Sequence, residues 1–185
     1  MADSLKANRG PGAAAENRAA LITAARTVFA SRGIDAPLNA VAKEAGVGQG
    51  SLYRHFPTRY ALAVAVFQQN LDWLERVGAE PFSTLGDVLM AITEQATVST
   101  AFFEMIEIER LDSGGHELSE RSRAIVESKM DAARASGEIP ATTTTDDVLL
   151  GIAMFTGALS KMVPDQRRAM APRIWALLPF GPTER

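Results

Sequence analysis

Apolar residues recur along this chain at the spacing of helix faces, and glycine or proline interrupts each series. In residues 14–31 the apolar positions follow the i, i+1, i+4, i+7, i+8 pattern of one helix face, and they are Leu21, Ile22, Ala25, Val28 and Phe29. Gly33 is typical of a helix C-terminus, and Pro37 suits the first turn of a helix. The pattern therefore predicts one helix that ends before Gly33 and a second that begins near Pro37.

The same periodicity continues through the rest of the chain. Short helices are expected at residues 37–46 and 49–56, and a long helix, which Thr58 can cap, at residues 58–79. Further helices are expected at residues 83–97, 99–110, 116–135, 145–162 and 166–178. The threonine run at residues 142–145 has strand propensity, and it is interpreted as the entry to a helix. We therefore expect an all-α protein, preceded by a disordered arm at residues 1–13.

The glycine-rich stretch GVGQGS at residues 46–51 allows two interpretations. A phosphate-binding loop requires a strand before its glycines, and a P-loop also requires a lysine and a hydroxyl after them. Here the glycines follow the helical segment AVAKEAG, and the lysine-plus-hydroxyl ending is absent. The alternative is two short helices joined by a turn at Gly46-Val47-Gly48, which is the helix-turn-helix arrangement. Its second helix enters the major groove of DNA.

The residue types after the turn suit such a helix. Gln49 offers a donor and an acceptor to a base edge, and Gly50 allows close backbone approach. Hydroxyl and imidazole groups that can donate to phosphates follow at Ser51, Tyr53 and His55. Arg59, at the start of the next helix, could bind a phosphate together with that helix's amides. An ordinary helical hairpin with solvated polar residues has the same spacing, so the spacing alone leaves both alternatives open.

The whole segment AVAKEAGVGQGSLYRHFPTRYAL resembles the DNA-binding segment of TetR-family transcriptional regulators. These proteins show an I-A-x-x-A-G-V-S-x-G-T-L-Y-x-Y/H-F-x-x-K/R-x-x-L pattern. The resemblance covers residues 14–67, while the remainder matches the family only in length and helical character. It implies an N-terminal three-helix domain with a helix-turn-helix at residues 14–61, and a helical effector-binding and dimerisation domain at residues 62–185.

Matched position by position, the resemblance implies base contacts by Gln49, Gly50 and Tyr53, and phosphate contacts by Ser51, Tyr53, His55 and Arg59. Asn39 and Lys43, on the preceding helix, are candidates for contact at the groove edge, although Lys43 is equally well interpreted as a solvated surface lysine. The sequence departs from the pattern at Gly48, where the usual serine could cap the recognition helix.

Composition narrows the classes of function. The chain has 46% apolar and 6% aromatic residues and no cysteine. Because it has no cysteine, it cannot contain disulfides, thiolate metal sites or a cysteine nucleophile. Its two histidines and the absence of metal-ligand spacing argue against catalysis, and we expect no enzymatic activity, catalytic residue, metal or cofactor. No stretch is long and apolar enough for a membrane span or a signal peptide, so we expect a cytoplasmic protein without membrane contact.

Charge divides the chain unevenly. Residues 1–60 carry eight Lys/Arg against four Asp/Glu, and residues 61–185 carry 11 against 18. A basic first third on an acidic remainder indicates that only the first third meets a polyanion such as double-stranded DNA.

A helix that is apolar all round must be covered on both sides, and residues 148–162 fit this description. One cover is the protein's own core, and a second copy of the chain is the expected other cover, as the family's dimers imply; a central helix buried in a monomer is the alternative. The residues expected at the dimer interface are Val148, Ile152, Phe155, Leu159, Met162, Trp175 and Leu178.

The resemblance also implies a pocket for a small, largely apolar effector between the middle helices. Methionine and aromatic side chains suit such a pocket, although for each residue taken singly core packing is the favoured interpretation. The candidate lining residues are Trp73, Met90, Phe102, Phe103, Met105, Ile106, Met154 and Phe155. We therefore expect a homodimeric regulator, in this family most often a repressor, that binds a palindromic operator and is released by a ligand. An effector-independent structural DNA-binding protein is the alternative.

Overall fold

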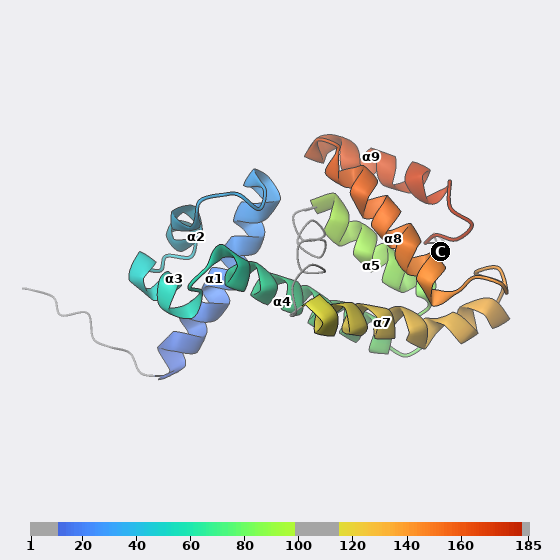
Figure 1. Cartoon of the computed structure of the whole chain (residues 1–185), viewed down its shortest axis with the longest axis horizontal. Coiled ribbons are helices and arrows are strands. Elements are labelled where there is room, and N and C mark those ends of the chain that lie inside the picture. Colours follow the sequence, from blue (N-terminus) through green and yellow to red (C-terminus); the bar gives the residue numbers. More distant parts are fainter. Residues whose placement is uncertain (1–10, 99–114, 183–185) are drawn as a thin grey trace, which may run out of the picture. The chain divides into compact units, whose positions relative to one another are not determined.

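The computed structural model describes residues 11–98 and 115–182, and these residues form eight α-helices and no strand (Figure 1). The expected all-α class is confirmed for this part of the chain. The helices are α1 (Pro11–Arg32), α2 (Leu38–Glu44), α3 (Gln49–His55), α4 (Arg59–Ala79), α5 (Leu85–Val98), α7 (Gly115–Ala135), α8 (Thr145–Ser160) and α9 (Pro164–Trp175). None of these helices combines the length and the apolar character that crossing a membrane requires. The helix expected at residues 99–110 lies outside the described residues.

The chain divides into two compact units, residues 1–66 and residues 67–185. The division falls within α4, between Val66 and Phe67, whereas the sequence placed the boundary after Ala61. We refer to the first as the head unit and to the second as the body unit, and each is described by itself.

In the head unit α1, α2, α3 and the start of α4 enclose a small core. Its members are the apolar positions that the periodicity selected, including Leu21, Phe29, Val41, Leu52 and Phe56, each at most 4% exposed. Helix α1 begins at Pro11, so residues 11–13 are helical although the sequence assigned them to a disordered arm. Residues 1–10 of that arm lie outside the described residues.

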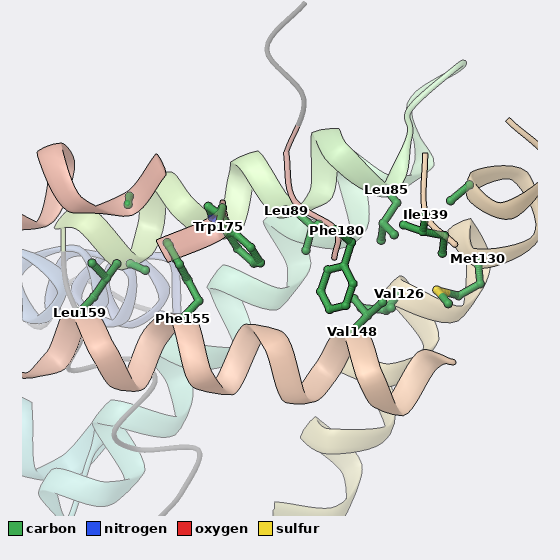
Figure 2. Close-up of a cluster of buried hydrophobic side chains, with 13 residues drawn as sticks. Leu85, Leu89, Val126, Met130, Ile139, Val148, Phe155, Leu159, Trp175 and Phe180 are labelled. Carbon is green, nitrogen blue, oxygen red and sulfur yellow. The ribbon is translucent and has the colours of Figure 1, made fainter. Parts of the chain in front are cut away.

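In the body unit α5, α7, α8 and α9 enclose a larger core, in which Phe155, Trp175 and Phe180 are prominent (Figure 2). The indole of Trp175 stacks on the ring of Phe155, with ring centroids 4.3 Å apart, and its Nε1 donates to Thr93 Oγ1 at 2.8 Å. This satisfies the single polar atom of a buried tryptophan. The two aromatic side chains therefore fasten α9 and α8 to α5 inside one subunit.

The threonine run before α8 is a helix entry, as the sequence suggested. Thr144 is the N-cap: its Oγ1 accepts from the backbone N–H of Asp147 at 3.2 Å, while the Asp147 carboxylate accepts from the Thr144 N–H at 2.8 Å. This reciprocal capping box satisfies two amide groups that a helix start leaves without partners. The carboxylate also accepts from the Thr144 hydroxyl at 2.6 Å, and the hydrogen bonds from this hydroxyl and from the Thr144 N–H hold the pKa of Asp147 below its ordinary value.

Candidate functional site

The turn between α2 and α3 is held by backbone hydrogen bonds. The Val47 N–H donates to Ala42 O at 3.0 Å and the Gly46 N–H to Lys43 O at 3.2 Å, which is the Schellman arrangement of a helix end. Gly46 has φ +65°, a left-handed conformation that a side chain disfavours. The predicted break at Gly46 is therefore confirmed, and it sets α3 at an angle to α2 as a helix-turn-helix requires.

Helix α3 presents a continuous exposed face. Gln49, Gly50 and Tyr53 are exposed, Tyr53 to 52%, while Leu52 points into the core. Gly48 precedes the helix as N-cap and supplies no side-chain hydrogen bond, as expected from its replacement of serine. The backbone at the start of α3 is therefore free of covering side chains, and Gln49 can approach a base edge there without displacing a capping group.

The flanks of this face carry the other predicted residues of the head unit. Ser51 and His55 are half-buried beside the exposed face of α3. Asn39 and Lys43 are exposed one turn apart on α2, where both project to the same side of that helix. Seven of the eight predicted contact residues therefore lie at or beside the surface formed by α2 and α3.

Arg59 is the exception. Its Nη1 donates to the backbone carbonyl oxygen of Ile34 at 2.6 Å and also to that of Ala36. Both carbonyl groups belong to the connection between α1 and α2, where no helix supplies a backbone N–H to them. The guanidinium therefore holds this connection against the start of α4, and it is not the free phosphate ligand that the sequence suggested. Thr58 fulfils its predicted capping role, since the Ala61 N–H donates to Thr58 Oγ1 at 3.0 Å.

Sequence reasoning missed Arg54. This exposed arginine in the last turn of α3 lies four residues after Gly50, which places it on the same side of the helix as Gly50. The helical period alone could have found it. A permanent positive charge there suits contact with a phosphate at the groove edge.

The four predicted pocket residues that the structure describes do not line the cavity of the body unit. Phe155 lies at 0% exposure in the core, whereas Met154, its neighbour in sequence, is 56% exposed on the opposite face of α8. Trp73 on α4 and Met90 on α5 are half-buried, and neither lines the cavity described below. The remaining four candidates, Phe102, Phe103, Met105 and Ile106, lie outside the described residues.

A cavity of about 680 Å³ does lie within the body unit. Helices α4 and α5 supply its floor, and α7 and α8 supply its walls. Figure 1 shows these two wall helices diverging from the connection at residues 136–144. The floor is wholly apolar and consists of Phe67, Leu71, Leu74, Val88 and Ile92. The sequence could not identify this set, because the same residues at the same spacing would equally well form a closed core.

Polar groups of the cavity lie on its walls. Arg123 on α7 forms an ion pair with Asp146 on α8, which raises the pKa of Arg123. On the face of α7 that meets α4, Arg121 donates to Glu75 and to Asp72 at 2.6–2.8 Å, and these hydrogen bonds raise its pKa. Within residues 11–98 and 115–182, no three acidic or histidine side chains gather as a metal site would need.

The residues predicted for the dimer interface lie mostly inside the subunit. Val148, Phe155, Leu159 and Trp175 are at most 4% exposed within a single chain, so no partner can reach them. Ile152, Met162 and Leu178 are half-buried against the same core. Gly151 is also covered, because a Cβ there would lie 2.6 Å from the ring of Phe180. The prediction is corrected at these positions: it selected the inward stripe of α8.

The outward stripe of α8 carries the exposed apolar surface. Leu150 is 61% and Met154 56% exposed, and nothing lies within 4 Å of a Cβ built at Gly157. Leu177, directly after α9, is 84% exposed. Isolated exposed apolar residues need no explanation, but two of them one turn apart on one helix, together with another after α9, are typical of a surface that another protein covers.

Comparison with known proteins supports the interpretation of the head unit. Residues 21–66 match the family model described as bacterial regulatory proteins, tetR family. An HTH-type transcriptional regulator of Staphylococcus aureus strain USA300 is 40% identical over 60 residues, a stretch that spans 32% of this chain and 32% of that protein.

The fold of the whole chain also has solved counterparts. A TetR transcriptional regulator from Streptomyces coelicolor is 29% identical, with a TM-score of 0.61, and the match covers 86% of this chain and 94% of that one. A TetR-family regulator from Rhodococcus sp., 19% identical, shares the fold with a TM-score of 0.57 over 89% of this chain and 99% of the other. The similarity therefore extends beyond the head unit, although only the fold is shared at the lower identity.

Proposed function

Because this chain belongs to the TetR family of bacterial regulatory proteins, we propose that it is a DNA-binding transcriptional regulator that acts as a homodimer and responds to a small molecule. The observation that carries this proposal is the exposed face of α3, with Gln49, Gly50, Tyr53 and Arg54, at the second helix of a helix-turn-helix. A core helix would bury such a face, and an enzyme would have no use for it.

Base readout is assigned to Gln49, whose amide can both donate to and accept from one adenine edge. The phosphate contacts are assigned to the groups around it, namely Ser51, Tyr53, Arg54 and His55, with Asn39 and Lys43 on α2 at the groove edge. Arg59 is left out, because its guanidinium is bonded to the carbonyl oxygens of Ile34 and Ala36.

Dimerisation is assigned to the outward stripe of α8 together with the end of α9. The support is the exposure of Leu150, Met154 and Leu177, which a second copy would cover about a two-fold axis. Two heads related by such an axis would bind a palindromic operator, since the symmetry of the site mirrors that of the protein. The small residues Ala153 and Gly157 on this side of α8 would let a partner helix approach closely.

The response to a small molecule is assigned to the cavity of the body unit. Its volume of about 680 Å³ is within the range of ligand sites, and its apolar floor suits a largely apolar molecule. Binding there releases DNA only if the ligand prefers a conformation that holds the two heads at the wrong spacing.

Selection of genomic fragments by the purified full chain, followed by fluorescence anisotropy on the enriched sequence, tests the DNA-binding part. We expect a palindromic site, a steep loss of affinity with salt, and about tenfold weaker binding for Gln49→Ala with unchanged thermal stability. Gln68→Ala, at an exposed position of α4 in the body unit, is the matched control and should leave affinity unchanged.

Two results would contradict the proposal. Equal affinity for the enriched and for random DNA would favour an effector-independent structural DNA-binding protein. A Gln49→Ala variant with wild-type affinity would show that α3 does not read the site.

A further inference from the structure

The cavity of the body unit is long as well as apolar. Its lining runs along α8 from Asp146 to Lys161, and 15 residues of helix at about 1.5 Å each span about 22 Å. A volume of about 680 Å³ spread over such a length leaves a narrow channel. This shape suits an extended chain better than a compact ring system.

The wall that α8 contributes changes in character along its length. The line of residues nearest the floor begins with Leu149 and Ile152 and continues with Thr156 and Ser160. Near its start this line is therefore aliphatic, like the floor, and near its end it carries two hydroxyls, which donate to backbone carbonyl oxygens of α8. An occupant that matches this gradient has an apolar body and a single polar end beside Ser160.

The charged lining residues distinguish the two ends of the cavity. Asp146 and Arg123 neutralise one another in an ion pair, and Glu120 lies three residues before Arg123 and contributes to the raised pKa of that arginine. Lys161 is different: within the described residues its ammonium group forms no ion pair or side-chain hydrogen bond, and it lies one residue after Ser160. The carbonyl end of α8 carries about half a negative charge, which the full charge of Lys161 exceeds.

We propose that this cavity binds an extended aliphatic carboxylic acid, with its chain along Leu71, Leu74 and Ile92 and its carboxylate at Lys161. The ammonium group would form the charge-assisted hydrogen bond to the carboxylate. The hydroxyls of Thr156 and Ser160 donate to backbone carbonyl oxygens of α8, so Lys161 is the donor that selects the acid. The inference rests on the proposed function in taking this cavity as the effector site, and it adds the chemical class of the effector and the residue that selects it.

Isothermal titration of the full chain, without DNA, with three probes of equal chain length tests the proposal: dodecanoate, 1-dodecanol and dodecylammonium, each below its micelle concentration. We expect dodecanoate to bind at least about tenfold more tightly than the alcohol, and the ammonium compound to bind most weakly. Lys161→Gln should abolish the preference for the acid over the alcohol, and Lys161→Arg should retain it. Arg32→Gln, which removes the charge of an exposed arginine in the last turn of α1, is the charge-matched control and should bind all three probes like the wild type.

A second variant tests whether the aliphatic chain of the probes lies in the cavity. Ser119 lines the cavity from α7, whereas the proposed dimer surface belongs to α8 and the end of α9. Ser119→Phe should therefore weaken all three probes at least about tenfold while the melting temperature stays close to that of the wild type. Unchanged binding by Ser119→Phe, or a preference for the acid that survives Lys161→Gln, would overturn the proposal.

The binding assay also separates this inference from the proposed function. If dodecanoate binds as expected and never alters operator affinity, the cavity assignment stands and effector control of DNA binding fails. If none of the probes binds while operator binding persists, the cavity assignment alone is overturned.

Discussion

The head and body units are both small helical assemblies, but they differ in whether the polarity of a helix face indicates its exposure. In the head unit the exposed face of α3 is polar and its buried face is apolar, so the sequence of α3 identifies which face is exposed. In the body unit α8 is apolar on both faces, with Phe155 fully buried and Met154 beside it 56% exposed. Sequence polarity therefore identifies the outer surface of the head, whereas in the body only the packing does so.

The largest expected effect distinguishes the buried apolar face of α8 from its exposed apolar face. Phe155→Ala removes a ring that stacks on Trp175 at 4.3 Å, and such a truncation in a core costs about 3–5 kcal/mol of unfolding free energy. We expect the body unit to lose most of its stability, measured by denaturant unfolding followed by the fluorescence of Trp73 and Trp175. Met154→Ala, one residue away, should change stability by less than about 0.5 kcal/mol.

Met154→Ala should instead weaken self-association, measured by sedimentation equilibrium, because it removes an exposed side chain from the proposed dimer surface. If Phe155→Ala were the variant that dissociated dimers while leaving the monomer stable, the inward and outward assignments of α8 would be reversed.

These two variants also show why the fold was largely predictable and the body's surfaces were not. Helix positions follow from periodicity and from residues such as Gly33 and Gly46, which act locally. Which apolar face of α8 meets the core depends on residues far away in sequence, among them Trp175 and Phe180, which pack against it (Figure 2). No local pattern reports such a contact, and the interface prediction selected the wrong stripe for that reason.

A smaller effect is expected in the head unit at Arg59. Arg59→Met removes two charge-assisted hydrogen bonds to the carbonyl oxygens of Ile34 and Ala36, which should cost about 2 kcal/mol of local stability. Because both tryptophans lie in the body unit, hydrogen exchange of the α2 amides is the suitable measurement, and we expect it to become faster. The slope of operator affinity against salt concentration should stay as it is in the wild type.

Arg54→Met is the matched variant, since Arg54 is exposed and lies on the α3 face. It should leave α2 exchange unchanged and reduce the salt slope by about 0.9 for each head, or about 1.8 for the homodimer, because each head loses one phosphate contact. A reduced slope for Arg59→Met with normal exchange would restore Arg59 as a phosphate ligand. An arginine at position 59 fits the family pattern whether it binds a phosphate or backbone carbonyl oxygens, so sequence resemblance could not decide between the two roles. The hydrogen bonds to the carbonyl oxygens of the α1–α2 connection favour the second role.

The smallest expected effect returns to the body unit and depends on pH. The Asp147 carboxylate accepts hydrogen bonds from the N–H and hydroxyl of Thr144, which lower its pKa in the folded state. A group with a depressed folded pKa stabilises the protein above its unfolded pKa, near about 3.9, and this contribution disappears as the pH falls through the lower folded value. Asp147→Asn should therefore melt below the wild type at neutral pH, and the two melting curves should converge below about pH 4.

Asp165→Asn separates capping from a general effect of negative charge at a helix start, because Asp165 lies in the first turn of α9, where Val163 supplies no side-chain cap. Its melting temperature should change less than that of Asp147→Asn at neutral pH, since it removes only the interaction with the helix dipole. Equal changes in the two variants, or a gap between Asp147→Asn and wild type that does not narrow as the pH falls below about 4, would mean that the capping box does not hold the start of α8. In that case the start of α8 would be held by packing, to which the buried residues Thr143, Thr145 and Val148 contribute.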